Sequence, residues 1–137
     1  MIFVDASVAV KWFLPEQGTE AAQAILSGSE KLIASALIRI EVAAAITRKL
    51  RLGELHVGEA EEACHLWIAA LSSGIITISP DEDSIESANE LAIQIRHPLQ
   101  DCLYLALARR VDGTLLTADP KFAERSHDCY AKVERLE

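Results

Sequence analysis

Four carboxylic acids stand at the boundaries of apolar segments in this sequence. Asp5 and Asp119 each close an apolar run, Asp101 opens one, and Glu41 interrupts one. Two unit charges about 5 Å apart repel by roughly 3 kcal/mol at an effective dielectric near 20. A whole domain is stable by only about 5–15 kcal/mol. If these side chains converge in the fold, the cluster needs a cation or bound protons, and the pattern therefore indicates a site for a hard metal ion.

Ligands that are all carboxylate oxygens favour Mg²⁺ or Mn²⁺ over zinc. The three cysteines lie far apart, without the paired spacing of a zinc site. We assign no role to the four histidines, because none has the spacing of a catalytic triad or a metal pair. They are His56, His65, His97 and His127. A carboxylate-bound Mg²⁺ or Mn²⁺ serves phosphate chemistry, by orienting a water and stabilising charge on phosphoryl oxygens.

Each acid also has a structural explanation when it is taken alone. Asp119 precedes Pro120 and is a natural helix N-cap, with proline at the first helical position. Asp5 can cap a following helix in the same way, and Asp101 suits the positive end of a helix dipole. Glu41 can be a partly exposed glutamate paired with a nearby arginine or lysine, Arg39 or Lys49.

Length and composition predict one ordinary globular domain. The chain has 137 residues, half of them hydrophobic and a quarter charged, so we expect residues 1–137 to form a single domain. No apolar run approaches the roughly 18 residues that a membrane span needs, and no basic leader precedes Met1. We therefore expect a soluble, cytoplasmic protein with no membrane partner.

The net charge of −8 argues against a protein that holds nucleic acid by a general basic surface. A nucleic-acid substrate would need local basic groups and a bridging divalent ion. The candidates are Arg48, Lys49 and Arg51, with Lys11 and Arg39 in addition. The alternative is an ordinary solvated helix end.

Short apolar runs rich in β-branched residues alternate with longer helical patterns, which predicts an α/β fold with a parallel sheet covered on both faces. The expected strands lie near 2–5, 31–34, 75–78, 114–118 and 130–134. The expected helices are 6–13, 18–28, 36–51, 57–73, 82–96, 98–111 and 120–126. Gly53 and Gly74 are expected to end the third and fourth helices. Segment 101–111 is apolar nearly all round, which is typical of a central buried helix.

This arrangement predicts that the four acids share one edge of the sheet. Ligands of open parallel sheets bind beyond the carboxyl ends of the strands, and Asp5 and Asp119 both lie where a strand gives way to a helix. Glu41 and Asp101 lie near helix starts and can reach the same edge. Ser7 and Thr117, each two residues from an aspartate, are either groups that orient these ligands or ordinary turn hydroxyls.

The sequence resembles the PIN-domain ribonucleases, specifically VapC-type toxins of VapBC toxin–antitoxin pairs. The resemblance rests on segments 4–13, 40–42, 100–106 and 116–122, which contain the four acids in order and span nearly the whole chain. It implies a three-layer α/β/α sandwich and a Mg²⁺- or Mn²⁺-dependent endoribonuclease that cleaves RNA phosphodiester bonds. It also implies a tightly bound antitoxin that blocks the acidic pocket, and a homodimer.

Carried onto this sequence, the resemblance makes Asp5 and Asp101 the foremost metal ligands. Glu41 and Asp119 then complete the acidic site by ligation, through a bound water or by positioning the nucleophile. The main alternative is a PIN-like module that binds a protein partner and has little catalytic activity. A dehalogenase-type phosphatase is disfavoured because position 7 is serine where a second aspartate is needed. A receiver domain is disfavoured because the third strand ends in Ile78-Ser79-Pro80, without a phosphoacceptor aspartate.

Overall fold

A computed structural model describes all 137 residues of the chain and contains one five-stranded sheet. Its strands are β1 (Ile2–Val4), β2 (Leu32–Ser35), β3 (Thr77–Ser79), β4 (Thr114–Thr117) and β5 (Val133–Arg135). They lie in the order β3-β2-β1-β4-β5, and every neighbouring pair is parallel. The predicted parallel sheet is therefore confirmed.

Three strands lie within one residue of their predicted bounds, and the other two begin later than predicted. The last strand was predicted at 130–134 but begins at Val133, because the Tyr130 N–H still donates to the Ser126 carbonyl at the end of the preceding helix (2.9 Å). The third strand was predicted at 75–78 but pairs with β2 only from Thr77. Before it, the Ile75 N–H donates to the Ser73 hydroxyl, which keeps that residue in the turn after the fourth helix.

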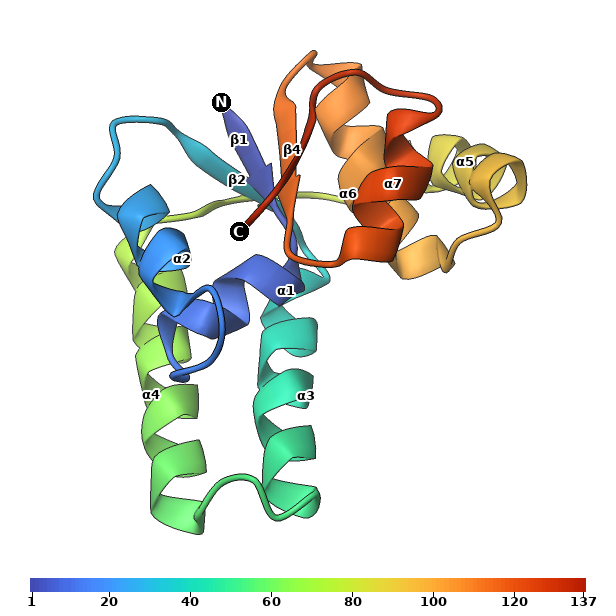
Figure 1. The fold of residues 1–137 in the computed structure, drawn as a ribbon. Helices are drawn as coiled ribbons and strands as arrows, with labels where there is room; N and C mark the ends of the chain where they lie inside the picture. The colour runs from blue at the N-terminus through green and yellow to red at the C-terminus, as the bar shows by residue number, and fades with distance from the viewer.

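The helices cover both faces of the sheet, which confirms the α/β/α sandwich (Figure 1). In Figure 1, α2 (Thr19–Leu26), α3 (Ile38–Arg51) and α4 (Val57–Ser73) lie on one side of the strands. On the other side are α5 (Ile85–Ile95), α6 (Leu99–Arg110) and α7 (Pro120–His127). The predicted helix 6–13 is a short α1 (Ala6–Ala9) continued by a 3₁₀ turn (Val10–Trp12), and a second 3₁₀ turn (Glu82–Ser84) precedes α5.

The expected helix ends are also confirmed. Gly74 caps α4 with φ of 76°, and Gly53, just beyond the end of α3, has φ of 76°. This left-handed conformation is one that glycine adopts without steric cost. The two glycines therefore fix the lengths of the paired helices α3 and α4, which project beyond the sheet in Figure 1.

Helix α6 is the central buried helix that the sequence predicted. Every residue from Cys102 to Ala108 is buried, and the helix contacts β1, β2 and β4. Burying a side chain such as Leu105 or Leu107 stabilises the fold by about 1.5–3 kcal/mol. Because this packing fixes α6 along its length, it also fixes Asp101 in the first turn of the helix.

The core also fixes the position of Glu41 in α3. Ile38, Val42 and Ile46 recur at intervals of four in α3 and are fully buried. Trp67 of α4 is also buried, and its indole N–H donates to the Arg39 carbonyl (3.2 Å). These contacts hold the first turn of α3 against the body of the protein, so the position of Glu41 is fixed by the core.

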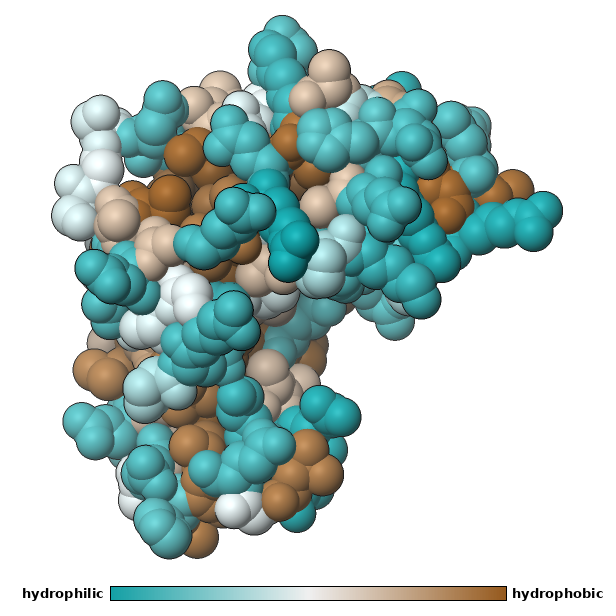
Figure 2. All heavy atoms as spheres, in the orientation of Figure 1, coloured by the Kyte–Doolittle hydropathy of each residue, from teal (hydrophilic) through white to brown (hydrophobic).

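The sheet order creates a switch point between β1 and β4, because the chain builds the sheet first to one side of β1 and then to the other. Ligands of such sheets bind beyond the carboxyl ends of the strands at this point. Figure 2 shows the surface indented between the lobe formed by α3 and α4 and the side formed by α5, α6 and α7. The N-terminal ends of α3, α6 and α7 border this indentation (Figure 1). None of the helices is long and apolar enough to cross a membrane.

Candidate active site

The structure places all four predicted acids at helix starts on the switch-point edge. Asp5 is the N-cap of α1 and accepts from the Val8 N–H (3.3 Å). Asp119 is the N-cap of α7, where its Oδ1 accepts from the N–H groups of Lys121 (2.9 Å) and Phe122 (3.3 Å). Asp101 lies in the first turn of α6 and Glu41 in the first turn of α3. The structural explanations for the three aspartates therefore hold as local geometry.

Asp5 is a buried carboxylate held by two hydroxyl groups. Its side chain accepts from the Ser7 hydroxyl at Oδ1 (2.5 Å) and from the Thr117 hydroxyl at Oδ2. The two hydroxyls in turn accept from the N–H groups of Ala118 (2.8 Å) and Asp119 (3.1 Å), so their protons point toward Asp5. Ser7 and Thr117 thus orient Asp5 and tie it to the turn between β4 and α7.

Burial raises the pKa of Asp5 to about 7, and the nearby charge of Asp101 adds to the effect. The hydrogen bonds from Ser7, Thr117 and Val8 act in the opposite direction. Desolvation therefore outweighs three donors that favour the charged form. Asp5 is a carboxylate that lacks a positive counter-charge from the protein.

Glu41 is half-buried and accepts a hydrogen bond from the Tyr104 hydroxyl at Oε1 (2.5 Å). Burial raises the pKa of Glu41, the Tyr104 bond lowers it, and the charges of Asp101 and Asp81 raise it further. The alternative ion pair with Arg39 or Lys49 is absent. Lys49 binds Glu16 instead (2.6 Å), and the Arg39 guanidinium donates to the Ala36 carbonyl (3.4 Å).

Asp101 links the four acids electrostatically. Burial is the main cause of the raised pKa of Asp101, the contact with His97 lowers this pKa, and the charge of Asp119 raises it. The charge of Asp101 in turn raises the pKa of both Asp5 and Glu41. No lysine or arginine forms an ion pair with any of the four. Desolvated carboxylates without a lysine or arginine partner are costly, so the site favours an added cation or protons.

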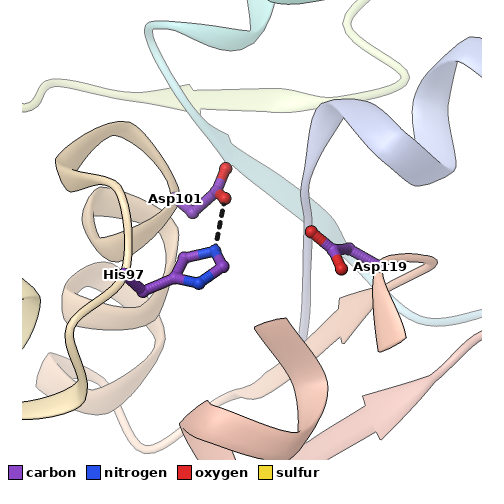
Figure 3. A group of neighbouring side chains, drawn as sticks. All are labelled: His97, Asp101 and Asp119. Carbon is purple, nitrogen blue, oxygen red and sulfur yellow. Dashed lines mark hydrogen bonds and ion pairs between the residues drawn. The ribbon is translucent and has the colours of Figure 1, made fainter. Parts of the chain in front are cut away.

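One histidine belongs to the site although the sequence pattern assigned it no role. Ligand atoms of His97, Asp101 and Asp119 all lie within 4.8 Å of one another. Figure 3 shows the three side chains. The His97 ring lies at the junction of α5 and α6 and is hydrogen-bonded to Asp101, while the Asp119 carboxylate faces the pair. Asp5 and Glu41 are not members of this compact group and are linked to it through their interaction with Asp101.

Sequence reasoning also missed Tyr104 and Asp81. Tyr104 is fully buried in α6, three residues after Asp101, and its hydroxyl faces Glu41. Asp81 follows β3 and accepts from the hydroxyl of Ser35, the last residue of β2 (2.7 Å). The available signals were an acid just after a strand for Asp81 and the spacing of four between His97 and Asp101.

The open oxygens of the site suit a hard cation. No protein group donates to Oδ1 of Asp101 or to Oδ2 of Asp119, because the hydrogen bonds of both side chains fall on the opposite oxygens. Asp5 has about four acceptor positions, three of them occupied, and so retains one. An all-oxygen set of this kind matches Mg²⁺ or Mn²⁺ and can place an ion against phosphate oxygens.

Comparison with known proteins gives a consistent result. The family described as PIN domain matches residues 2–127. Ribonuclease VapC3 of Pyrobaculum aerophilum is 29% identical over 125 residues, covering 90% of this chain and 93% of the relative. A VapC ribonuclease of Rhizobium meliloti is 34% identical over 143 residues, covering 90% and 97%.

Solved structures share the fold at lower sequence identity. Mycobacterium tuberculosis VapC20, a toxin that cleaves the sarcin-ricin loop, superposes with a TM-score of 0.76 at 16% identity and covers 98% of this chain and 99% of its own. A toxin–antitoxin complex from Klebsiella pneumoniae superposes with a TM-score of 0.68 at 16% identity, covering 100% and 98%. These likenesses show that the fold is that of the compared chains.

Proposed function

The chain belongs to the PIN domain family, and we propose that it is a Mg²⁺- or Mn²⁺-dependent endoribonuclease that acts as the toxin of a type II toxin–antitoxin pair. The observation that carries the proposal is the convergence of four carboxylates on one sheet edge without any neutralising lysine or arginine. Two relatives that match most of the chain are named as ribonucleases, which supports RNA as the substrate.

We assign ion binding to Asp5 and Asp101, with Asp119 completing the set through its open Oδ2. When bound, a divalent ion would supply positive charge to a phosphate oxygen and orient a water for in-line attack on phosphorus. The hydroxyls of Ser7 and Thr117 keep the Asp5 carboxylate in one orientation. The buried α6 does the same for Asp101.

Glu41 is suited to accept the proton of the attacking water. Tyr104 occupies Oε1, which leaves Oε2 available, and partial burial with the charges of Asp101 and Asp81 favours the protonated form. A general base works best when its pKa is near the working pH. Raising the pKa of a glutamate above its ordinary value moves that pKa toward the working pH. Tyr104 stays protonated because burial raises the pKa of its hydroxyl, so it remains a donor.

RNA binding in an acidic protein needs local positive charge. A cavity of about 490 Å³ is lined by two basic residues, Lys11 and Arg135, and one acidic residue, Glu137. Ala118 and Pro120, which flank Asp119, border it. We propose that the RNA backbone enters along this side. Of the candidates from the sequence, Lys11 and Lys49 already share Glu16 (3.0 and 2.6 Å), so their charge is partly neutralised.

An antitoxin partner and a homodimer are also part of the proposal. The structural likeness to a toxin–antitoxin complex supports the first. Ile40, the neighbour of Glu41 in α3, is 71% exposed and offers an apolar contact beside the acidic site. For the second, sedimentation of the purified chain should give a mass near twice 15.0 kDa.

The test is cleavage of a mixed structured RNA pool by antitoxin-free protein with Mn²⁺ or with EDTA. Wild type is compared with Asp5→Asn and with a matched control, Asp112→Asn, which changes an exposed aspartate paired with Lys132. Mn²⁺-dependent fragments should appear with wild type and the control and vanish with Asp5→Asn. Mn²⁺ binding without cleavage would leave the RNA substrate to be identified, whereas the absence of both cleavage and Mn²⁺ binding would favour a module that acts by binding a protein partner.

A further inference from the structure

Both ring nitrogens of His97 are engaged by protein groups. Nε2 lies 2.7 Å from Oδ2 of Asp101, and Nδ1 lies 3.1 Å from Nη1 of Arg125 in α7. The ring also stacks on Phe122, with centroids 4.8 Å apart and planes at 14°. Only 4% of the His97 side chain is exposed, so no water competes freely for these contacts.

These contacts determine which nitrogen carries the proton. An arginine guanidinium has five N–H donors and no acceptor, so Arg125 donates and Nδ1 of His97 accepts. A neutral imidazole that accepts at Nδ1 carries its proton at Nε2. His97 therefore donates from Nε2 to Asp101, and neither nitrogen has a free lone pair for a metal ion.

We infer that His97 is a positioning residue for Asp101 and not a metal ligand, and that Arg125 assigns it this role. The inference rests on the proposed metal site. In the common arrangement a carboxylate orients a histidine that binds the metal. Here the order is reversed, since the histidine orients a carboxylate whose other oxygen, Oδ1, is open (Figure 3).

Arg125 also joins the two helices that carry the compact group. Its Nη1 donates to the Arg96 carbonyl (2.9 Å), at the left-handed end of α5 where Arg96 has φ of 53°. Arg125 lies on α7, the helix capped by Asp119, whereas Asp101 lies on α6. The bond thus couples the position of Asp119 to that of Asp101 through the α5–α6 junction.

The consequence for metal choice follows from ligand type. Because both ring nitrogens of His97 are engaged by protein groups, only carboxylate oxygens remain to bind the ion, and these favour Mn²⁺ and Mg²⁺. If Arg125 is removed, the ring can move its proton to Nδ1 and turn a free Nε2 toward the ion. The set of one histidine and two carboxylates, from His97, Asp101 and Asp119, then resembles a zinc site. Arg125 is thereby a determinant of metal selectivity.

The first test measures Mn²⁺ affinity without RNA, by calorimetry or by the electron paramagnetic resonance signal of free Mn²⁺. His97→Ala removes the donor to Asp101 and should weaken Mn²⁺ binding about 10–100-fold, the usual cost of losing such a partner. His97→Gln keeps an N–H near the same place and should stay within about 3-fold of wild type, on the same scale. Equal losses in the two variants, or no loss in either, would overturn the positioning role.

The second test examines Arg125 by comparing Arg125→Met with Arg110→Met, which removes an equal charge from an exposed residue at the far end of α6. Arg125→Met should raise the preference for Zn²⁺ over Mn²⁺ by at least about 10-fold, the lower limit set by the partner effect above, and Arg110→Met should leave it unchanged. An unchanged preference in Arg125→Met would overturn the selectivity role.

Nitrogen-15 NMR of the histidine ring gives a readout that is independent of metal binding. Wild type without metal should show His97 protonated at Nε2, and Arg125→Met should shift the ring toward the Nδ1-protonated form. An Nδ1-protonated ring in wild type would overturn the inference directly. Failure of wild type to bind Mn²⁺ would overturn the proposed metal site, whereas normal Mn²⁺ binding with the wrong tautomer would overturn only the role of His97.

Discussion

Replacing Asp5 with asparagine should stabilise the metal-free protein at neutral and alkaline pH. Burial raises the pKa of Asp5 to about 7 from an ordinary 3.8. At ~1.4 kcal/mol per pKa unit, this corresponds to about 4 kcal/mol of preference for the neutral carboxyl. Because the folded state binds the proton more tightly than the unfolded state, the contribution of Asp5 is fully present below pH 3.8. It is lost as the pH rises through about 7.

Asparagine removes this dependence and keeps the helix cap, since asparagine and aspartate are similar N-caps. The substitution disturbs one hydroxyl bond, because the amide N–H₂ must face either Ser7 or Thr117, at a cost of about 1 kcal/mol. The net gain at pH 8 is then up to about 3 kcal/mol, by the same pKa arithmetic. Near pH 4 the variant should be no more stable than wild type.

The assay is urea unfolding at pH 5 and pH 8 in EDTA, with Asp112→Asn as the control for an exposed aspartate. In a second series, Mn²⁺ should restore the free energy of unfolding of wild type at pH 8 and leave that of Asp5→Asn nearly unaffected. Parallel pH profiles for wild type and Asp5→Asn would refute the assignment of Asp5 as the buried, uncompensated charge. Equal Mn²⁺ effects on both proteins would refute its role as an ion ligand.

Three other substitutions test neighbouring contacts. Tyr104→Phe removes the donor that lowers the pKa of Glu41, so the acid limb of the pH–rate profile should move to higher pH, whereas unfolding should remain cooperative. Thr117→Val removes a donor to Asp5, so its pKa should rise further, and the buried site should lose about 1–3 kcal/mol of stability in denaturant titrations. Arg135→Gln should raise the KM for RNA and lower the slope of log affinity against log salt by about 0.7, the value for one phosphate contact with a single strand. A slope in wild type much steeper than about −2 would contradict binding through so few basic groups.

Much of the fold was predictable because its signals are local. Short β-branched runs and helical periodicity identified all five strands and the seven helices. The glycines with positive φ explain why the ends of α3 and α4 were placed correctly. The errors at β3 and β5 arose where a residue of strand type is still bonded to the preceding helix end, as Tyr130 is to Ser126. Composition does not reveal such a bond.

Some residues of the site could likewise be predicted from local sequence signals, and others could not. Glu41 was detectable because a carboxylate inside an apolar segment breaks the local pattern, and the aspartates because they stand at strand and helix ends. His97 was not detectable, since its role depends on Arg125, which is 28 positions away and reaches it only when α7 packs beside α6. The partner of Glu41 was also missed, because the Tyr104 hydroxyl meets it across 63 positions.

An aspartate can cap a helix and bind an ion at the same time, because its carboxylate has two oxygens. The two explanations of the aspartates in the sequence are therefore compatible. Asp119 caps α7 with Oδ1 and leaves Oδ2 open, and Asp101 receives His97 on Oδ2 and leaves Oδ1 open. The helices α1, α3 and α7 each follow a parallel strand, and α6 packs along the sheet and leads directly into β4. All four therefore start at the carboxyl edge of the sheet, and the acids that suit a helix start gather there. The positive ends of these helices offset part of the mutual repulsion, by about 0.3–1 kcal/mol for each acid. A repulsion of roughly 3 kcal/mol for each close pair exceeds this offset. The fold therefore assembles the acids for local structural reasons and leaves a residual negative charge that a divalent ion can neutralise.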